Sequence, residues 1–565
     1  MEEEGNEVVI VKNVYGDVCI RKKARRKRQK VLVQELLYDY ANNTTLHGLP
    51  YITRRGLTNV EKVFWFITFI ASIALCMYLI SKVWFKWQTS PVIVTFSEQM
   101  VPVSMVPFPS VTLCPQSKVK VSAYNFTDEK IKLDAFLETK PANETLNATM
   151  RARFAKFDAL FQICDKTFLY NEFDLTEVYP TTRADASMVK YMFEAAPNFT
   201  DIFEYCKFAG DYVSCRELFD KVLTREGICY NLNSLAADEI FRYRNLQRDY
   251  KYSYATRKSN GWSMEYGYDF VINSSFYPLP GSEGIAAPIV EAVLKSSSLE
   301  RDQLCNVINS GFRVYIQHPS DVPQTSLYYY AVLHNQVSSM AISFDVLNTS
   351  ESLRGYDPEV RQCYFPDERY LKYFKIYSSK NCRMECLANI TFSLCQCVEF
   401  YMPHSSSNKI CTGDDDDCIF LARGEMLKQE SIQGNFTCHC LPSCNSVDYN
   451  AEILKTDFKL KKFINIVKKL RNYSDDSFNN INLSKIEMYF MKPRFLSMRR
   501  SELFGVTDFL ANCGGLLGLF LGFSFLSLVE IIYFLSLRLC CTLKKDLEEE
   551  KAKANLEQEY EIEKY

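Results

Sequence analysis

The most unusual chemistry in this sequence lies near the C-terminus, where residues 513–534 read CGGLLGLFLGFSFLSLVEIIYF. Gly514, Gly518 and Gly522 recur every fourth residue, so on a helix they form a stripe along one face. Glycine costs about 1 kcal/mol relative to alanine in a helix interior, so the stripe needs a reason. It either lets helices pack closely or forms the wall of a pore that exposes backbone carbonyls to ions. Spacing alone favours packing.

Two neighbouring features shift the balance towards an ion path. Gly522, Phe523 and Ser524 lie about midway along residues 509–537, where Glu530 is the only charged residue. Small and polar residues can break a helix there, and irregular backbone at membrane depth is tolerated where protein or water satisfies it. A carboxylate inside a span is costly and indicates a functional site or ion path. A structural hydrogen bond or an interhelical salt bridge is the equally weighted alternative for Glu530.

Two membrane spans are predicted to position these residues. Residues 63–81 are 19 uncharged residues, close to the ~20 that cross a hydrocarbon core, and a buried core helix is the disfavoured alternative. Residues 509–537 exceed what a straight span needs, so we expect tilting, bending or a break. The basic cluster at residues 21–30 places the N-terminus in the cytosol, and two spans return the C-terminus there. No cleavable signal peptide is expected, because a long basic segment precedes the first span.

Cysteine usage independently indicates that the region between the spans is extracellular. Sixteen of the 21 cysteines lie there, an even number suited to an oxidised ectodomain with up to eight disulfides of undetermined pairing. The disulfide candidates are Cys114, Cys164, Cys206, Cys215, Cys229, Cys305, Cys363, Cys382, Cys386, Cys395, Cys397, Cys411, Cys418, Cys438, Cys440 and Cys444. The glycosylation candidates are Asn125, Asn143, Asn147, Asn198, Asn273, Asn348, Asn389, Asn435, Asn472 and Asn482.

The densest cysteine block runs from residue 378 to residue 444 and is expected to be a disulfide ladder. Ser378 or Ser379 can cap a helix on which Cys382 and Cys386 share one face. A metal site is the disfavoured alternative for its C-x-C and Cys-His-Cys groups, because the compartment is oxidising. The acidic tract at residues 414–417 is expected to be a solvated loop rather than a calcium site.

Strands are expected where the ectodomain joins the spans. Residues 102–115 alternate small apolar residues with proline and are typical of extended chain. Residues 486–491 have strand alternation, with Ile486, Met488 and Phe490 on one face. Two strands attached directly to the two spans are expected to pair and form a stem.

Signs of enzymatic chemistry are sparse. The chain has only 5 histidines, and it contains no phosphate-binding glycine loop, no nucleophile elbow and no His-Glu-x-x-His motif. We therefore expect no enzyme, no cofactor and no metal. The net charge of -2 is too small to suggest a nucleic-acid partner.

Several separated motifs together resemble a known channel family. His47-Gly48 lies before the first span, FPSVTLC follows it, the cysteine-rich block ends in CHCLPSC, and DFLANCGGLLGLFLGFSFLSLVEIIYF forms the second span. In this order they resemble the degenerin/epithelial sodium channel/acid-sensing ion channel superfamily, most closely its insect pickpocket branch. The resemblance covers roughly residues 45–120 and 360–535.

The resemblance implies the fold class. It implies an α+β membrane protein with two transmembrane helices, N- and C-terminal, a large disulfide-rich, hand-shaped ectodomain, and a trimeric channel. The implied domains are a cytosolic N-terminus (1–62), transmembrane helix 1 (63–85), the ectodomain (86–502, with a thumb at about 372–460), pore-lining transmembrane helix 2 (503–538) and a cytosolic tail (539–565).

The resemblance also assigns roles to particular residues. It places the selectivity filter at Gly522, Phe523 and Ser524 and the cytosolic gating motif at His47 and Gly48. It places pore and gating positions at Ala511, Asn512, Gly514, Gly515, Gly518 and Glu530, with Ala511 at the gating-sensitive small-residue position and Gly518 at the position linked to amiloride block. The sequence departs from relatives in having the bulky Phe523 mid-filter, and its tail has no proline for a ubiquitin-ligase docking motif.

The expected function is therefore a sodium-permeable, amiloride-sensitive cation channel subunit of the plasma membrane, gated by a ligand or by force. Its partners are sodium ions, membrane lipids and related subunits in a homo- or heterotrimer. Two alternatives stay open: a subunit that conducts only beside a different chain, and a two-span receptor or adhesion protein. Force, peptide, acid, osmolality and pheromone are all open as the stimulus.

Overall fold

The computed structural model describes residues 31–89, 92–139, 146–164, 187–247, 251–269, 276–282, 288–306, 310–325, 328–431, 438–471 and 480–562. The chain divides into two compact units, each described by itself. One contains the chain up to Ile93 together with Glu502–Tyr565, and the other is Val94–Ser501.

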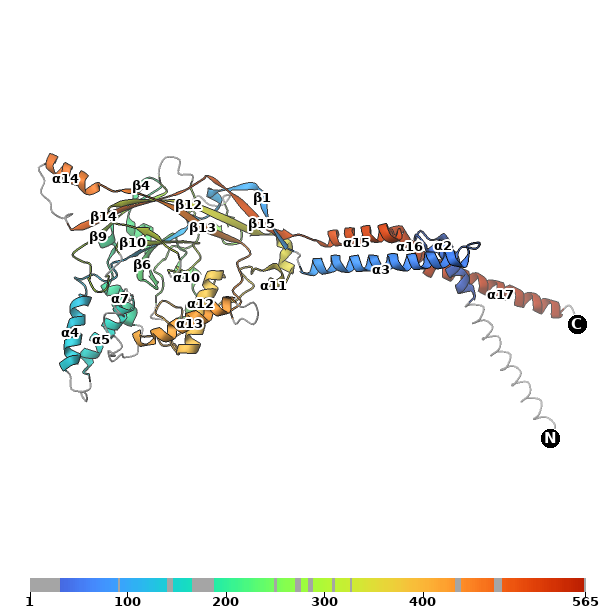
Figure 1. Cartoon of the computed structure of the whole chain (residues 1–565), viewed down its shortest axis with the longest axis horizontal. Coiled ribbons are helices and arrows are strands. Elements are labelled where there is room, and N and C mark those ends of the chain that lie inside the picture. Colours follow the sequence, from blue (N-terminus) through green and yellow to red (C-terminus); the bar gives the residue numbers. More distant parts are fainter. Residues whose placement is uncertain are drawn as a thin grey trace, which may run out of the picture. The chain divides into compact units, whose positions relative to one another are not determined.

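The first unit is helical. Its elements are α2 (Leu49–Thr53), α3 (Asn59–Thr89), α15 (Val506–Leu521), α16 (Phe525–Tyr533), the π-helical turn η5 (Phe534–Arg538) and α17 (Leu539–Ile562), and residues 31–43 are also helical. Helices α3 and α15 run side by side (Figure 1), and at one end the ring centroids of Trp84 and Trp87 lie 5.6 and 5.0 Å from that of Phe509. Paired tryptophans near a helix end are typical of a membrane interface.

The helices of this unit present apolar side chains outward. Cys76 is the only buried residue described in α3, and α15 has none. Among the described residues, two helices are long and apolar enough to span a membrane, namely Asn59–Thr89 and the continuous helix Phe525–Glu549. The first helix is longer at both ends than the predicted span 63–85. The predicted second span is broken into α15 and α16, and its helix continues beyond residue 538 as α17.

The second unit is built on two larger β-sheets. Within the described residues, the first sheet has the order β1 (Val92–Pro102), β15 (Arg494–Glu502), β12 (Gln336–Thr349), β14 (Ile481–Phe490), β9 (Val290–Ser297), β3 (Phe203–Phe208) and β4 (Asp211–Val213), with β13 (Ser446–Asp457) antiparallel to β12. The second has the order β11 (Tyr330–Val332), β10 (Phe312–Gln317), β2 (Ser110–Pro115), β6 (Gly227–Leu232) and β5 (Phe219–Thr224). A short hairpin joins β7 (Trp262–Ser263) to β8 (Gly267–Tyr268).

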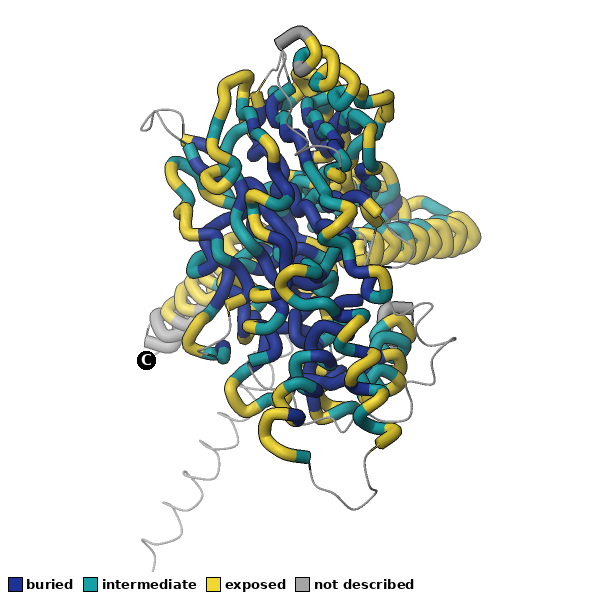
Figure 2. Tube along the Cα trace, turned by 90° about the vertical axis from the view of Figure 1, so that its left-hand side faces the viewer, coloured by how far each residue is buried: buried dark blue, intermediate teal, exposed yellow. Residues whose placement is uncertain are grey.

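The core of this unit lies between the two sheets. Leu113 of β2, Val290 of β9 and Ile486 of β14 belong to one buried apolar cluster. All six residues of β2 and all six of β6 are buried, as expected for strands covered on both faces. Figure 2 shows this buried interior as a dark blue trace surrounded by teal and yellow segments.

The expected pairing of span-attached strands is present, but between other segments. β1 follows α3 in the chain, β15 precedes α15, and the two strands pair with each other. The segments named from sequence lie elsewhere. Residues 110–115 form β2 of the second sheet, and residues 486–490 belong to β14, which pairs with β9 and β12. The correction arises because the sequence alternation marks the most buried strands rather than the edge strand β1.

Helices and eight disulfides complete the second unit. Its helices are α4 (Phe126–Thr139), α5 (Ala148–Phe161), α7 (Ser187–Ala195), α8 (Phe199–Ile202), α9 (Cys215–Leu218), α10 (Ala237–Ile240), α11 (Pro358–Arg361), α12 (Ser379–Cys395), α13 (Asp416–Ser431) and α14 (Leu460–Arg471), with 3-10 turns at Val103–Met105, Tyr243–Asn245, Glu351–Gly355 and Gly413–Asp415. The disulfides are Cys114–Cys229, Cys164–Cys305, Cys206–Cys215, Cys363–Cys444, Cys382–Cys440, Cys386–Cys438, Cys395–Cys418 and Cys397–Cys411. All sixteen cysteines between the spans are thus paired.

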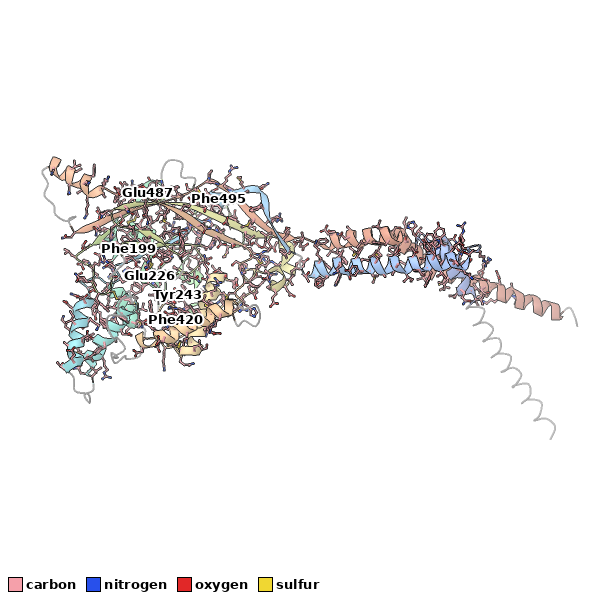
Figure 3. The ribbon with its side chains drawn as sticks, in the orientation of Figure 1. Phe199, Glu226, Tyr243, Phe420, Glu487 and Phe495 are labelled. Atoms are coloured by element: carbon pink, nitrogen blue, oxygen red, sulfur yellow. A yellow bond between two sulfur atoms is a disulfide. The ribbon has the colours of Figure 1, made fainter. Side chains whose placement is uncertain are left out.

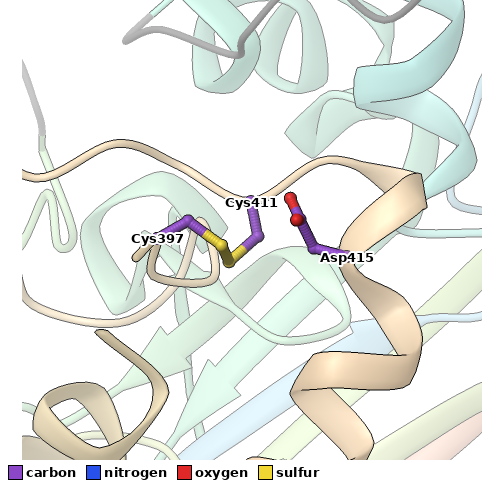
Figure 4. Close-up of side chains that lie close together, drawn as sticks. All are labelled: Cys397, Cys411 and Asp415. Carbon is purple, nitrogen blue, oxygen red and sulfur yellow. A yellow bond between two sulfur atoms is a disulfide. The ribbon is translucent and has the colours of Figure 1, made fainter. Parts of the chain in front are cut away.

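The cysteine-rich block is a pair of helices tied by these bonds. Ser378 caps α12, because its Oγ accepts a hydrogen bond of 3.1 Å from the backbone N–H of Asn381. Cys397, Cys411 and Asp415 lie close together (Figure 4), but the two sulfurs are joined at 2.07 Å and do not supply thiolate ligands. The acidic tract is not the expected solvated loop. Asp414 and Asp415 lie in the 3-10 turn Gly413–Asp415, where Asp415 accepts a hydrogen bond from the N–H of Thr412 at 2.9 Å, and Asp416 and Asp417 begin α13.

A buried carboxylate braces the second sheet. Glu226, labelled in Figure 3, lies in the turn between β5 and β6. It accepts a hydrogen bond of 2.6 Å from the Lys118 ammonium and one of 3.1 Å from the Arg313 guanidinium. The hydroxyl of Tyr315 also donates to it. Paired and hydrogen-bonded in this way, the charge is held inside the fold.

Candidate functional site

The site is built around the break between α15 and α16. Gly522 ends α15 in the left-handed conformation, with φ +64°, and its N–H donates to the Gly518 carbonyl at 2.9 Å. This is the αL type of helix end, for which glycine has no steric penalty. Ser524 then caps α16, because its Oγ accepts from the N–H of Ser527 at 3.3 Å while its own N–H donates to the Ser527 Oγ at 3.0 Å. Three residues, Gly522 to Ser524, therefore separate the end of α15 from the start of α16.

The turn at residues 44–48 lies against this break. The backbone N–H of His47 donates to the Leu521 carbonyl at 2.9 Å, which satisfies one of the carbonyls left open at the end of α15. A β-carbon added to Gly522 would lie 2.1 Å from the His47 Nδ1. Glycine is thus required at residue 522 both by its backbone conformation and by the imidazole beside it.

A chain of hydroxyl groups connects the same turn to the intramembrane carboxylate. The Thr45 Oγ1 lies 2.7 Å from the Ser527 Oγ and donates to the Glu530 Oε2 at 3.1 Å. Ser527 is 1% exposed, and its Oγ also accepts a hydrogen bond from the N–H of Ser524, the residue that caps α16. The order of donors is then Ser524 N–H, Ser527 O–H and Thr45 O–H, ending on the carboxylate of Glu530.

Gly48 positions the turn against the first membrane helix. It has φ +92°, and a β-carbon there would lie 3.3 Å from the Phe69 ring. One turn later Tyr51 stacks on Trp65 with ring centroids 4.6 Å apart. The two glycines therefore serve one purpose, which is to let residues 44–48 approach both α3 and the break closely.

The helical segment 31–43 packs beside the far end of the second membrane helix. The ring centroids of Tyr40 and Phe534 lie 5.3 Å apart, and the Arg538 guanidinium lies 3.7 Å from the Asp39 carboxylate. The Tyr38 hydroxyl donates to the Thr53 carbonyl at 2.8 Å. Residues between Asp39 and His47 thus contact the second membrane helix from Leu521 to Arg538.

Comparison with known proteins now identifies the family. The family model described as "Amiloride-sensitive sodium channel" matches residues 40–534. The chain belongs to the amiloride-sensitive sodium channel family. It is 28% identical over 515 residues to "Pickpocket protein 28" of Drosophila melanogaster, covering 89% of this chain and 78% of that protein. It is 21% identical over 514 residues to "Sodium channel protein Nach" of Drosophila melanogaster (90% and 88%) and 23% identical over 504 residues to "Acid-sensing ion channel 2" of Homo sapiens (88% and 85%).

These matches confirm the resemblance to the degenerin/epithelial sodium channel superfamily and its pickpocket branch. Members of this family are ion channels rather than enzymes, and the fold is the expected trimeric channel fold with two membrane helices and a disulfide-rich ectodomain. Membership also argues against the two-span receptor or adhesion protein.

The other predicted channel residues lie together on α15, apart from the His47 turn. Among the described residues, no atom lies within 4 Å of a β-carbon added to Gly514 or Gly515, and only the Phe523 carbonyl, at 3.8 Å, lies near one added to Gly518. Ala511 and Asn512 are exposed, and the Asn512 amide donates to the Asp508 carbonyl at 2.8 Å. No contact among the described residues of one chain requires these glycines to be small, whereas a trimeric channel has further subunits that can pack on this face.

Two residues of the site escaped sequence reasoning, namely Thr45 and Ser527. The available signal was weak. Thr45 precedes His47 by two positions, and Ser527 stands three residues after Ser524, a spacing typical of a capping pair. Only the fold brings residues 482 positions apart to within 2.7 Å of each other.

Proposed function

We propose that the chain is a subunit of a sodium-permeable, amiloride-sensitive cation channel of the plasma membrane, with both termini in the cytosol. The supporting observation is the helix break at Gly522, Phe523 and Ser524, on which the His47 turn docks. The sequence of the second membrane helix, the two candidate spans and the family support the assignment.

The break is suited to act as the selectivity filter. Where an α-helix is interrupted, backbone groups no longer bond along the helix axis and become available to other partners. Three copies around one axis would form a ring of carbonyls and small side chains that replaces part of the hydration shell of sodium. Phe523 is half-buried within one chain, so the bulky filter residue already has contacts inside its own subunit.

The His47 turn is suited to hold that ring in its conducting shape. Its hydrogen bond to Leu521 and the Thr45–Ser527 contact act on either side of the filter residues. A shift of this turn would therefore move the end of α15 and the start of α16 together. This gives the cytosolic His47-Gly48 motif a direct mechanical route to the pore.

Gating is proposed to begin in the ectodomain, in response to a ligand or to force. The disulfides make its interior stiff, and β1 and β15 are continuous in the chain with the two membrane helices. Assembly is proposed as a homotrimer or as a heterotrimer with related subunits.

The deciding experiment measures whole-cell current in oocytes expressing Ala511→Val. A bulkier side chain at this small position on α15 is expected to wedge symmetry-related helices apart and produce a constitutive current. External sodium is exchanged for potassium, and amiloride is then added. The expected result is an amiloride-blocked current with a sodium-positive reversal potential. Leu519→Val, at an exposed position two turns further along α15, is the matched control.

The outcomes separate the candidate functions. No current from Ala511→Val, despite protein at the surface, would overturn homomeric conduction. Current that then appears on co-expression with a related subunit would establish an obligate heteromer. Current with no preference for sodium over potassium would contradict sodium selectivity at a filter containing Phe523.

A further inference from the structure

Cys540 and Cys541 differ from the other described cysteines because their thiols are both free and exposed. Sixteen are paired in disulfides, and the free thiols among the described residues are those of Cys76, Cys513, Cys540 and Cys541. Cys76 is buried and Cys513 is partly buried on α15, whereas Cys540 and Cys541 are exposed. Two adjacent exposed thiols on one helix are therefore available to a reagent or an enzyme.

Cys540 and Cys541 lie where the apolar part of the second membrane helix ends. After Arg538 the sequence continues as Leu539, two cysteines, Thr542 and Leu543, and charge returns only at Lys544 and Lys545. Just before them, Leu535 and Leu537 are each 62% exposed, as expected for side chains that face lipid. The cysteines thus occupy the last apolar turn before a pair of lysines, where a membrane helix leaves the hydrocarbon core.

Arg538 does not mark the end of the membrane segment, because it has a partner. Its guanidinium lies 3.7 Å from the Asp39 carboxylate, on the helical segment 31–43. Tyr40 of the same segment packs on Phe534. The N-terminal segment covers this side of the helix, and both thiols still remain exposed beside it.

The helix also aligns each thiol with a lysine. Cys540 and Lys544, and likewise Cys541 and Lys545, are four residues apart on α17, so each lysine lies about 6 Å further along the axis on the same face. Lysine ammonium groups at this depth attract the anionic headgroups of the inner leaflet. The thiols then lie just inside the headgroup layer, within reach of a lipid-borne acyl donor.

We propose that Cys540 and Cys541 are S-acylation sites that accept a long-chain fatty acyl group from acyl-coenzyme A. The cysteine thiolate attacks the thioester carbonyl carbon, a new carbon–sulfur bond forms, and the bond to coenzyme A breaks. Coenzyme A leaves as a thiolate and takes up the proton released by the cysteine, so no oxidant or reductant is needed. Acyl chains at this point tether the start of α17 to the inner leaflet.

Acylation would act on the pore through one continuous helix. Helices α16, η5 and α17 follow one another without a break from Phe525 to Ile562. Tethering residues 540 and 541 therefore restricts the tilt of the helix that begins at the filter. The proposal rests on the cytosolic location of the tail in the proposed function.

The experiment counts thioesters on the full-length channel expressed in insect cells. Free thiols are blocked with N-ethylmaleimide, thioesters are cleaved with neutral hydroxylamine, and the new thiols are tagged with maleimide-polyethylene glycol. We expect two tags on the wild type, one on Cys540→Ser or Cys541→Ser, and none on the double variant. Cys76→Ser and Cys513→Ser are matched controls that keep both tags, and Cys19→Ser tests a cysteine outside the described residues.

Each other outcome overturns the proposal in a distinguishable way. Absence of hydroxylamine-dependent tags, or tags that persist in the double variant, would refute acylation at these residues. Labelling of Cys540 and Cys541 by a membrane-impermeant maleimide on intact cells would place the tail outside and refute the proposed topology. Protection from that reagent together with no tags would refute acylation alone and leave the proposed topology standing.

Discussion

Replacing Gly522 by alanine tests the contact between the His47 turn and the helix break that we propose as the filter. Gly522 has φ +64°, and an added β-carbon would lie 2.1 Å from the Nδ1 and 2.4 Å from the Cε1 of His47. These distances are far below van der Waals contact, so the imidazole or the backbone must move. We expect the turn to leave the break and the channel to lose current.

The magnitude follows from two separate costs. A residue with a β-carbon in the left-handed region costs about 1–2 kcal/mol. Displacing the turn also removes the His47–Leu521 hydrogen bond, which contributes about 1 kcal/mol. Together they amount to about 2–3 kcal/mol, or a shift of about 30- to 150-fold in the equilibrium between the docked and undocked turn.

The assay is the current of surface-expressed channels, normalised to surface protein, in the Ala511→Val background. Gly424→Ala on α13 is the matched control, because among the described residues no atom lies within 4 Å of its added β-carbon and its φ is not positive. A double-mutant cycle with His47→Ala isolates the clash, since that variant removes the ring atoms near Gly522. When residue 47 is alanine, Gly522→Ala should cost only the backbone strain. Its effect on the current should then be at least several-fold smaller than in channels that keep His47.

Two results would refute this reasoning. Gly522→Ala could reduce the current by the same factor in channels that keep His47 and in channels with His47→Ala. His47 would then not lie against the helix break in the working channel. Alternatively, Gly424→Ala could reduce current as much as Gly522→Ala, and the loss of current would then not arise from the left-handed helix end.

Three further predictions follow from other contacts. Thr45→Val keeps the shape of Thr45 but removes the hydroxyl between Ser527 and Glu530. We expect single-channel recordings of Thr45→Val to show an altered open probability, and those of the control Thr45→Ser to be close to wild type. Equal open probabilities of the two variants would argue against the chain of hydroxyl groups. Gly48→Ser should lower the open probability, because the backbone of Gly48 has φ +92° and a β-carbon added there would lie 3.3 Å from the Phe69 ring. Currents equal to those of the wild type would show that the turn does not dock on α3. Burial raises the pKa of Glu226, but the charges of Lys118 and Arg313 and the hydrogen bonds from Lys118 and Tyr315 outweigh it and lower this pKa to about 2. The ion pair therefore stabilises the fold above pH ~4.5 by up to about 3 kcal/mol, and this stability is lost as the pH falls towards 2. Glu226→Gln should lower the melting temperature of the purified channel at pH 7 by several degrees, with a difference that shrinks between pH 5 and pH 3. Glu204→Gln is the control, because Glu204 is exposed and its ion pair with Lys295 should contribute little. A difference that does not change with pH would show that the charge of Glu226 is not responsible.

Much of this protein follows from local properties of the sequence. The two spans were predictable because hydropathy acts over about 20 consecutive residues. The break at Gly522 and Ser524 was predictable because glycine and serine end and begin helices through their own backbone and hydroxyl groups. The even number of cysteines between the spans likewise predicted an oxidised ectodomain.

Tertiary structure alone decided which distant residues meet. Cys164 pairs with Cys305 across 141 residues, and sixteen cysteines allow far too many pairings for spacing to select one. β1 pairs with β15, although the strongest strand alternation lies elsewhere, because edge strands bury less apolar surface. Thr45 reaches Ser527 and Glu530 only because two glycines allow the His47 turn to approach the broken helix. The sequence thus determined where the membrane helix breaks, whereas the fold determined what closes around the break, because hydrogen bonds between remote segments leave no periodic trace in the chain.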